Sequence, residues 1–194
     1  WRFKKKKKFF YRKIEDFILE NKIELFIIAV PPRFQFEYVK KISKFKIPII
    51  LEKPLGINIK QINQLKKLLG KNIMNHAIDF NFLTSSPFQY LIKKYLGNNT
   101  QKKIKVSWKV PKRKKNKSWK NQYEKGGGIE NNFIIHIISI FVFCFKGLKV
   151  LKKSKKKRIF LRAKNKTDIE ISYCYNNTEK NYFKFIIEYK NFLI

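Results

Sequence analysis

The segment 49–56 reads Ile-Ile-Leu-Glu-Lys-Pro-Leu-Gly, so a short apolar run ends in a charged pair that is followed by proline. A residue before proline avoids the helical region, and the chain therefore turns at Lys53. Ligands of open α/β sheets bind at the carboxyl ends of the strands. The pattern predicts an ammonium group, with the Glu52 carboxylate beside it, at a rigid corner of a ligand site. A surface lysine in an ordinary strand-to-helix turn is the alternative.

A second candidate group is His136, which lies in an apolar run eight residues after the last of three consecutive glycines. Imidazole titrates near neutral pH and suits acid or base catalysis, although a lone histidine on an apolar helix is also typical of a core residue. His76, close to Asp79, fits a hydrogen-bonded structural histidine better than a group that faces a ligand. Residues 126–128 most simply permit a close backbone approach where a helix begins, with cofactor contact as the lesser alternative.

The elements that must position these groups follow from hydrophobic periodicity. The first part alternates between helices and strands with short links, which predicts a partial doubly wound parallel sheet in a domain of residues 1–80. Apolar residues at helical spacing predict helices, and continuous apolar runs predict strands buried on both faces. The predicted helices are 11–21, 34–44 and 59–69, and the predicted strands are 22–30, 47–51 and 73–80.

After residue 80 the pattern changes to helices followed by a run of strands, which predicts an α+β domain over residues 81–194 with an open, mostly antiparallel sheet. Residues 103–110 alternate, with Ile104, Val106, Trp108 and Val110 on one face. The predicted helices are 87–96 and 131–145, and a meander of strands is expected over 158–163, 169–175 and 182–189.

The formal net charge of +33 raises nucleic acid as a partner, and the basic clusters 4–8, 112–117 and 152–157 would carry it. Lys, Ile, Asn and Phe are enriched together, as codons rich in A and T would cause, and the clusters lack the interleaved aromatics of a stacking platform. Nucleic-acid binding is therefore kept only as an alternative, and no specific nucleic acid is expected.

Cys144 and Cys174 lie far apart, without metal-ligand spacing, so we expect reduced core cysteines, no metal site and a cytoplasmic protein. The most apolar segment, 133–145, is shorter than the roughly 18 residues that span a bilayer, so no membrane partner is expected. The start of the chain is interpreted as an interior cut in a longer sequence.

Taken in order, three motifs and a histidine resemble the Gfo/Idh/MocA oxidoreductases, the family of glucose-fructose oxidoreductase and inositol dehydrogenase. Two further segments are similar to a branch of that family often found among sugar-modifying enzymes. The motifs are Ala29-Val30-Pro31-Pro32, Glu52-Lys53-Pro54-Leu55-Gly56 and Gly126-Gly127-Gly128 with His136 after them; the further segments are Asp79-Phe80-Asn81-Phe82 and Ser118-Trp119-Lys120.

The resemblance implies an NAD(P)-dependent oxidoreductase that acts on a sugar or polyol derivative, with NAD or NADP on a Rossmann domain. It gives Lys53 the role of orienting the substrate hydroxyl and His136 the role of acid or base. It also implies a homo-oligomer formed through the C-terminal sheet, with exposed apolar residues of 169–175 and 182–187 at the interface. The implied cofactor-binding residues are Ala29, Pro31, Pro32, Glu52, Lys53 and Pro54, and the implied substrate-binding residues are Lys53, Trp119, Lys120, Asn132 and His136.

The chain also departs from the family pattern. The glycine-rich phosphate loop that opens a Rossmann domain is absent from the sequence, and the last sheet is expected to be incomplete. Gln35 stands where many members have His, and Phe82 where many have Arg. Asn132 and Ser139 replace the two Asp residues that usually flank the histidine. A catalytically inactive family remnant that acts as a binding protein is therefore an alternative, and dinucleotide binding with or without turnover separates the two.

Overall fold

The computed structural model describes residues 14–70, 75–97, 100–111, 118–145, 147–154, 157–176 and 180–189. The chain divides into two compact units, Trp1–Asp79 and Phe80–Ile194. The predicted fold class, a partial doubly wound parallel sheet followed by an α+β unit with an open, mostly antiparallel sheet, is confirmed.

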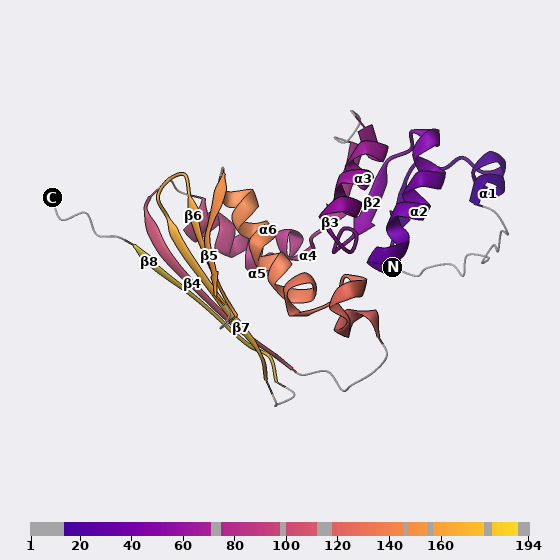
Figure 1. The fold of residues 1–194 in the computed structure, drawn as a ribbon. Helices are drawn as coiled ribbons and strands as arrows, with labels where there is room; N and C mark the ends of the chain where they lie inside the picture. The colour runs from indigo at the N-terminus through magenta and orange to yellow at the C-terminus, as the bar shows by residue number, and fades with distance from the viewer. Residues whose placement is uncertain are drawn as a thin grey trace. The chain divides into compact units, whose positions relative to one another are not determined.

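Unit 1 contains a three-stranded parallel sheet of order β1-β2-β3, with helices between successive strands (Figure 1). Its strands are shorter than the sequence predicts. Strand β2 has only four residues with which its neighbours can pair, and Pro48 before β2 and Pro31 after β1 limit further pairing. The strands are β1 (Phe26–Ile28), β2 (Ile49–Glu52) and β3 (His76–Asp79); the helices are α1 (Ile14–Glu20), α2 (Pro32–Ile42), the 3-10 turn η1 (Ser43–Phe45) and α3 (Ile59–Leu69).

Local sequence explains where the helices begin and end. Pro32 occupies the first turn of α2, where its missing N–H costs no hydrogen bond. The Asn58 side chain caps α3 by accepting a hydrogen bond from the Gln61 N–H at 3.0 Å. Gly70 ends α3 at φ +61°, a conformation that glycine adopts without strain. The bounds predicted for α3 are confirmed.

The two faces of the first sheet differ in burial. Ile28, Ile49 and Leu51 are buried with side chains of α2 and α3, which contact each other. The register places Ile27, Ile50 and Ala77 together on the opposite face. Ile27 is 68% exposed there. The expectation that the strands are buried on both faces therefore holds for one face of the described sheet.

Unit 2 contains a five-stranded sheet of order β5-β6-β7-β4-β8, whose helices all lie on one face (Figure 1). The β4–β7 pair is parallel and the other pairs are antiparallel. The strands are β4 (Lys102–Pro111), β5 (Leu148–Ser154), β6 (Arg158–Ala163), β7 (Asp168–Asn176) and β8 (Tyr182–Tyr189). The helices and turns are α4 (Asn81–Thr84), α5 (Ser86–Leu91), η3 (Ile92–Leu96), η4 (Trp119–Asn121), η5 (Tyr123–Lys125), η6 (Glu130–Ile134) and α6 (Ile135–Cys144).

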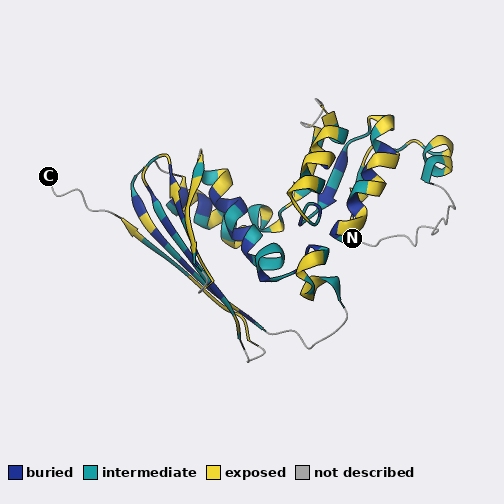
Figure 2. Cartoon of the chain, viewed as in Figure 1, coloured by how far each residue is buried: buried dark blue, intermediate teal, exposed yellow. Residues whose placement is uncertain are grey.

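The predicted meander is wrong, because β4 lies between β7 and β8. The inward side chains of β4, from Ile104 to Val110, are at most 7% exposed, so this strand occupies the interior of the sheet. Figure 2 shows the buried residues concentrated where the helices meet the sheet. Strand β5 was not predicted because it is rich in lysine and almost wholly exposed, as suits an edge strand.

Two further expectations need correction. A helical run of 22 residues, Tyr123–Cys144, is long and apolar enough to pass for a membrane span, but half of its most apolar 18-residue window is buried inside the protein, as in a core helix. Cys144 packs partly against the core as expected. Cys174, by contrast, follows the buried Tyr173 on β7, so the strand alternation places it on the open face of the sheet.

Lys102, the first residue of β4, is fully buried, and burial lowers the pKa of its ammonium group. The charged form is thus less favourable in the folded state than in the unfolded chain. We expect Lys102→Met to raise the free energy of unfolding at pH 7. The gain should shrink as the pH rises from the lowered pKa towards 10.5, because the folded state then loses the proton first. Denaturant unfolding of both proteins across this range checks it; a pH-independent difference would contradict it.

Candidate functional site

The turn that carries Lys53 is held by a side chain from α2. Gln35 is fully buried, and its amide nitrogen donates to the Glu52 carbonyl at 2.6 Å. Its amide oxygen accepts from the Gly56 N–H at 2.8 Å. One side chain therefore satisfies backbone groups before and after Lys53-Pro54, whose peptide bond is cis. Lys53 itself is half-buried in this turn.

The predicted cofactor-binding residues come to one edge of the first sheet. Ile28 pairs with Leu51 in a parallel register, so the turn of Ala29 to Pro32 and the turn of Glu52 to Pro54 both leave the sheet at its carboxyl edge. Ala29 is exposed, Pro31 is half-buried and Pro32 is buried. The sequence noted Gln35 only as a departure from a family pattern and gave no sign that it fixes this edge.

The residues at this edge fit one end of a dinucleotide. The proline turn and the rigid Glu52–Gly56 turn offer an apolar surface beside one ammonium group. The pyrophosphate of a dinucleotide requires backbone N–H groups presented by a glycine-rich turn at a helix start. The sequence contains no G-x-G-x-x-G pattern, and its seven glycines supply none. The edge therefore fits the nicotinamide end and not the pyrophosphate.

His76 is the first residue of β3, at the amino end of the sheet and hence away from the edge that carries Lys53. Its Nδ1 accepts a hydrogen bond from the Ile49 N–H at 3.1 Å. Burial lowers the pKa of the imidazole, and the bond requires an unprotonated Nδ1. The structural interpretation of His76 therefore fits the observed contacts.

His136 lies on α6 and is 5% exposed. The Phe82 ring stacks on its imidazole, with centroids 4.5 Å apart and an interplanar angle of 20°. The Phe80 ring meets it edge-on at 6.5 Å, and the Trp108 ring stacks on Phe82 with centroids 5.7 Å apart. The Ser139 hydroxyl donates to the His136 backbone carbonyl at 2.8 Å. A carboxylate at this position could only accept hydrogen bonds. The imidazole thus sits in a largely aromatic environment.

The three glycines form a tight turn against the backbone of residues 119–120. A Cβ on Gly127 would lie 2.2 Å from the Trp119 carbonyl oxygen and 2.7 Å from the Lys120 backbone. The Gly128 N–H donates to the Lys120 carbonyl at 3.0 Å. The Asn132 amide nitrogen reaches the carbonyls of Lys120 and Gly128, each at 2.8 Å. The prediction of a close backbone approach is confirmed, and it brings Trp119, Lys120 and Asn132 together.

Asn132 shows why this position carries an amide in this chain. Its amide nitrogen donates to two backbone carbonyls, which an aspartate cannot do because its ionised carboxylate only accepts. The residue therefore ties the turn at the start of the helix to the Trp119 loop. It does not replace the carboxylate that would orient a catalytic histidine.

A pair that the sequence analysis missed joins the same helix start to the sheet. The Tyr173 hydroxyl on β7 donates to Glu130 Oε1 at 2.9 Å, and burial, followed by this bond, raises the pKa of the tyrosine. Lys153 Nζ lies 3.9 Å from the same oxygen. These residues are far apart in the sequence, so no local pattern could have found the pair.

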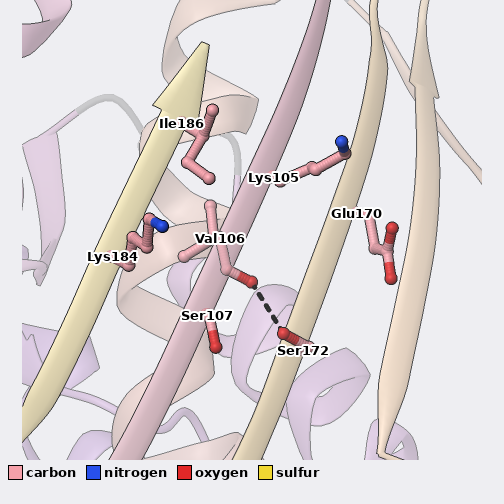
Figure 3. Close-up of a pocket in the computed structure, with 7 residues that line it drawn as sticks. All are labelled: Lys105, Val106, Ser107, Glu170, Ser172, Lys184 and Ile186. Carbon is pink, nitrogen blue, oxygen red and sulfur yellow. Dashed lines mark hydrogen bonds between the residues drawn. The ribbon is translucent and has the colours of Figure 1, made fainter.

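A shallow hollow of about 180 Å³ lies on the open face of the second sheet, opposite the helices (Figure 3). The Ser172 hydroxyl in it donates to the Val106 carbonyl at 3.2 Å. Among the residues that the structure describes, no group of His, Cys, Asp and Glu is placed to hold a metal ion. The hollow is lined by Lys105, Val106, Ser107, Glu170, Ser172, Lys184 and Ile186.

Burial corrects part of the expectation that apolar residues of 169–175 and 182–187 are exposed, since Tyr175, Tyr182 and Phe183 are 36–45% exposed whereas three residues of β7 are buried. Ile169, Ile171 and Tyr173, which were expected to be exposed, point into the core and are at most 4% exposed. Strand alternation puts charged and polar residues of β7 on the open face instead.

Residues 3–75 match the model of an oxidoreductase family with an NAD-binding Rossmann fold. An uncharacterised oxidoreductase of Synechocystis sp. is 29% identical over 124 residues, which cover 61% of this chain and 33% of that protein. Over residues 3–75 the chain is similar to the Gfo/Idh/MocA oxidoreductases. It spans about a third of the length of this curated relative.

Solved structures share the fold of this chain at low sequence identity. Levoglucosan dehydrogenase, in complex with NADH and levoglucosan, has a TM-score of 0.72 at 18% identity, covering 92% of this chain and 55% of that one. Biliverdin reductase from Synechocystis sp., in complex with biliverdin and NADP+, has a TM-score of 0.69 at 14% identity, covering 92% of this chain and 61% of that one. These two proteins act on chemically different compounds, so the shared fold leaves the substrate open.

We expect Gly127→Ala to destabilise unit 2 by at least about 2 kcal/mol, because the added methyl group would collide with backbone that cannot move aside. Gly97→Ala is the matched control, since its Cβ would approach only the Ile92 and Lys93 carbonyl oxygens, at 3.4 and 3.6 Å. Denaturant unfolding measures both. Equal effects of the two substitutions would contradict the close approach.

His76 predicts a pH dependence of stability. The unfolded chain takes up a proton near pH 6.5, whereas the folded chain does so only at lower pH. The free energy of unfolding should therefore be highest above that value and should fall as the pH drops through 6.5 to the lowered pKa. In His76→Asn this loss should be absent. A variant that keeps the full pH dependence would show that another group causes it.

Proposed function

We propose that the protein is an NAD(P)-dependent oxidoreductase that acts on a CH–OH group of a sugar or polyol derivative. The observation that carries the proposal is the clamped turn: Gln35 holds Lys53 at the carboxyl edge of a sheet that belongs to an NAD-binding Rossmann family. The sugar class is supported by relatives such as levoglucosan dehydrogenase and a myo-inositol dehydrogenase of Corynebacterium glutamicum.

In this proposal the nicotinamide, when bound, supplies the site that accepts or returns hydride. The turn of Ala29 to Pro32 and the turn of Glu52 to Pro54 would contact it. The Lys53 ammonium would donate a hydrogen bond to the substrate oxygen and stabilise the negative charge that grows there as hydride leaves the carbon. His136 would take the hydroxyl proton and return it in the reverse direction, so that proton and hydride are both accounted for.

Substrate contacts are proposed for Trp119, Lys120 and Asn132. Lys120 is exposed, and its Nζ lies 6.0 Å from the centre of the Trp119 ring, so one aromatic face and one cation stand together. For Asn132 the substrate contact is proposed from the family resemblance alone, since its amide nitrogen already donates to two carbonyls. A homo-oligomer through the open face of the C-terminal sheet and a cytoplasmic location remain predictions.

A second candidate function is that of a binding protein without turnover. Its support is the surroundings of His136, which is 5% exposed under the Phe82 ring, together with the structural use of Asn132. A proton acceptor must reach the substrate hydroxyl within hydrogen-bond distance, and the stacked phenylalanine covers one face of the imidazole. Turnover separates the two candidates.

The test uses the 194-residue chain. Because the edge fits only the nicotinamide end, reduced nicotinamide mononucleotide should bind about as tightly as NADH in fluorescence titrations. With oxidised cofactor and a panel of sugars and polyols, the formation of reduced nicotinamide should be followed by absorbance. We expect Lys53→Ala to lower kcat/KM by at least about 100-fold, a typical size for loss of one group that stabilises the developing charge.

Lys60→Ala is the control, because Lys60 is an exposed lysine on the neighbouring helix α3. It should leave cofactor affinity and turnover unchanged. Cofactor binding without turnover of any substrate would favour the binding protein. Absence of binding by either nucleotide would overturn the oxidoreductase proposal for this chain.

A further inference from the structure

The exposed side of α2 carries aromatic rings next to cationic side chains. Phe34 is 41% exposed and Tyr38 is 43% exposed, and the same helix exposes Arg33 and Lys41. Phe34, Tyr38 and Lys41 occupy positions i, i+4 and i+7, so they follow one another along one side of the helix. We call Arg33, Phe34, Tyr38 and Lys41 the aromatic stripe.

Within the aromatic stripe a cation already lies over a ring. The guanidinium carbon of Arg33 is 4.3 Å from the centre of the Phe34 ring, which is the geometry of a cation–π contact. Burying an aromatic side chain stabilises a fold, yet Phe34 and Tyr38 both keep about two fifths of their surface in solvent. Two such side chains, one turn apart on one helix, offer a partner flat surfaces on which to stack.

The helices of unit 1 carry almost only positive charge. Helix α3, which contacts α2, has three lysines and no acidic residue, and exposed residues run along both helices (Figure 2). A surface with this balance attracts polyanions. Over α2 and η1, four exposed basic residues stand against the single carboxylate of Glu37; they are Arg33, Lys40, Lys41 and Lys44.

The two rings indicate which polyanion fits. A lipid surface takes up a wide apolar helix face, whereas Val39 and Ile42 of α2 are buried in the core of unit 1. In a duplex each base is covered by its neighbours, so only a single strand offers base faces to a protruding ring. Phe34 and Tyr38 are separated by about 6 Å along the helix axis, since each residue rises about 1.5 Å. Stacked nucleotides are only about 3.4 Å apart, so the rings match a strand whose bases are unstacked.

We propose that the aromatic stripe of α2 binds single-stranded nucleic acid without preference for base sequence. The rings of Phe34 and Tyr38 stack on bases, and Arg33 and Lys41 contact the phosphates next to them. The lysines of α3 add to the attraction for the strand. The interleaved aromatics that the three lysine clusters of the sequence lack are thus present on a helix outside those clusters. The binding does not depend on the proposed oxidoreductase activity.

The test titrates the 194-residue chain into a fluorescent oligothymidylate of about 12 nucleotides, and into an abasic strand with the same number of phosphates. We expect Phe34→Leu and Tyr38→Leu each to weaken binding of the oligothymidylate at least about fivefold at physiological salt, the size typical for loss of one stacked base. Neither substitution should change binding of the abasic strand. Phe143→Leu is the matched control, because Phe143 is a 65% exposed aromatic residue on α6, and it should leave both affinities unchanged.

Salt dependence separates stacking from general attraction, because a net charge of +33 draws any polyanion to the chain. The logarithm of the affinity for a single strand falls with the logarithm of the salt concentration, with a slope of about −0.7 for each phosphate contact. Lys41→Gln should therefore make the slope shallower by about 0.7. Phe34→Leu and Tyr38→Leu should lower the affinity and leave the slope unchanged.

Equal affinity for the two strands, or unchanged affinity in both aromatic variants, would overturn the inference, because charge alone would then explain the binding. So would tighter binding of a duplex than of the single strand. Binding to phosphatidylserine vesicles that the aromatic variants weaken, with normal binding of the oligonucleotide, would assign the stripe to a lipid surface instead. Oligouridylate of the same length shows whether RNA or DNA binds more tightly, and either result supports the inference. Circular dichroism checks folding, and Tyr38→Leu keeps the test decisive if Phe34→Leu unfolds unit 1.

Discussion

The hydrogen bonds of one buried amide hold the turn that carries Lys53 in unit 1. Gln35 donates to the Glu52 carbonyl and accepts from the Gly56 N–H, and its side chain is fully buried. A buried backbone group that lacks a hydrogen bond costs about 1–3 kcal/mol. Separating α2 from the turn after β2 would therefore cost stability, unless water reached the groups that lose their hydrogen bonds. An amide is suited to this position because it offers one donor and one acceptor together. The backbone on both sides of Lys53 is therefore held by a residue on another element.

In the second unit an irregular turn is held mainly by close contact between backbone segments instead of by a buried side chain. Gly127 lets the chain approach the Trp119 carbonyl more closely than any Cβ would allow, and the Asn132 amide closes the turn from the helix side. Both devices convert irregular chain into a fixed corner at the end of a regular element. They differ in tolerance: a side-chain clamp can be exchanged for another donor and acceptor, whereas the contact at Gly127 excludes every other residue.

Local sequence predicted what depends on local patterns. The bounds of α3 follow from Asn58 and Gly70, and the alternation of β4 fixes which of its side chains are buried. The sheet order did not follow, because the parallel pairing of β4 with β7 joins segments about 65 residues apart and leaves no trace in either. Strand β5 was missed because an exposed edge strand needs no apolar alternation.

The candidate site divides in the same way. Lys53 and the glycines were found because proline and glycine restrict the backbone wherever they occur. The Gln35 clamp and the bond from Tyr173 to Glu130 were not found, because they link residues 17 to 43 positions apart through side chains that are common in any protein. The resemblance also placed Asn132 among the substrate contacts. Only the hydrogen bonds to two backbone carbonyls reveal that it also stabilises the turn before the helix.

The two units differ in how much apolar surface they bury. The core of unit 2 includes 18 buried hydrophobic residues, whereas that of unit 1 includes six, from Ile28 to Leu65. Burying one isoleucine side chain contributes about 1.5–3 kcal/mol, which is a large share of the 5–15 kcal/mol by which a domain is stable. Unit 1 therefore depends more heavily than unit 2 on each apolar side chain that it buries.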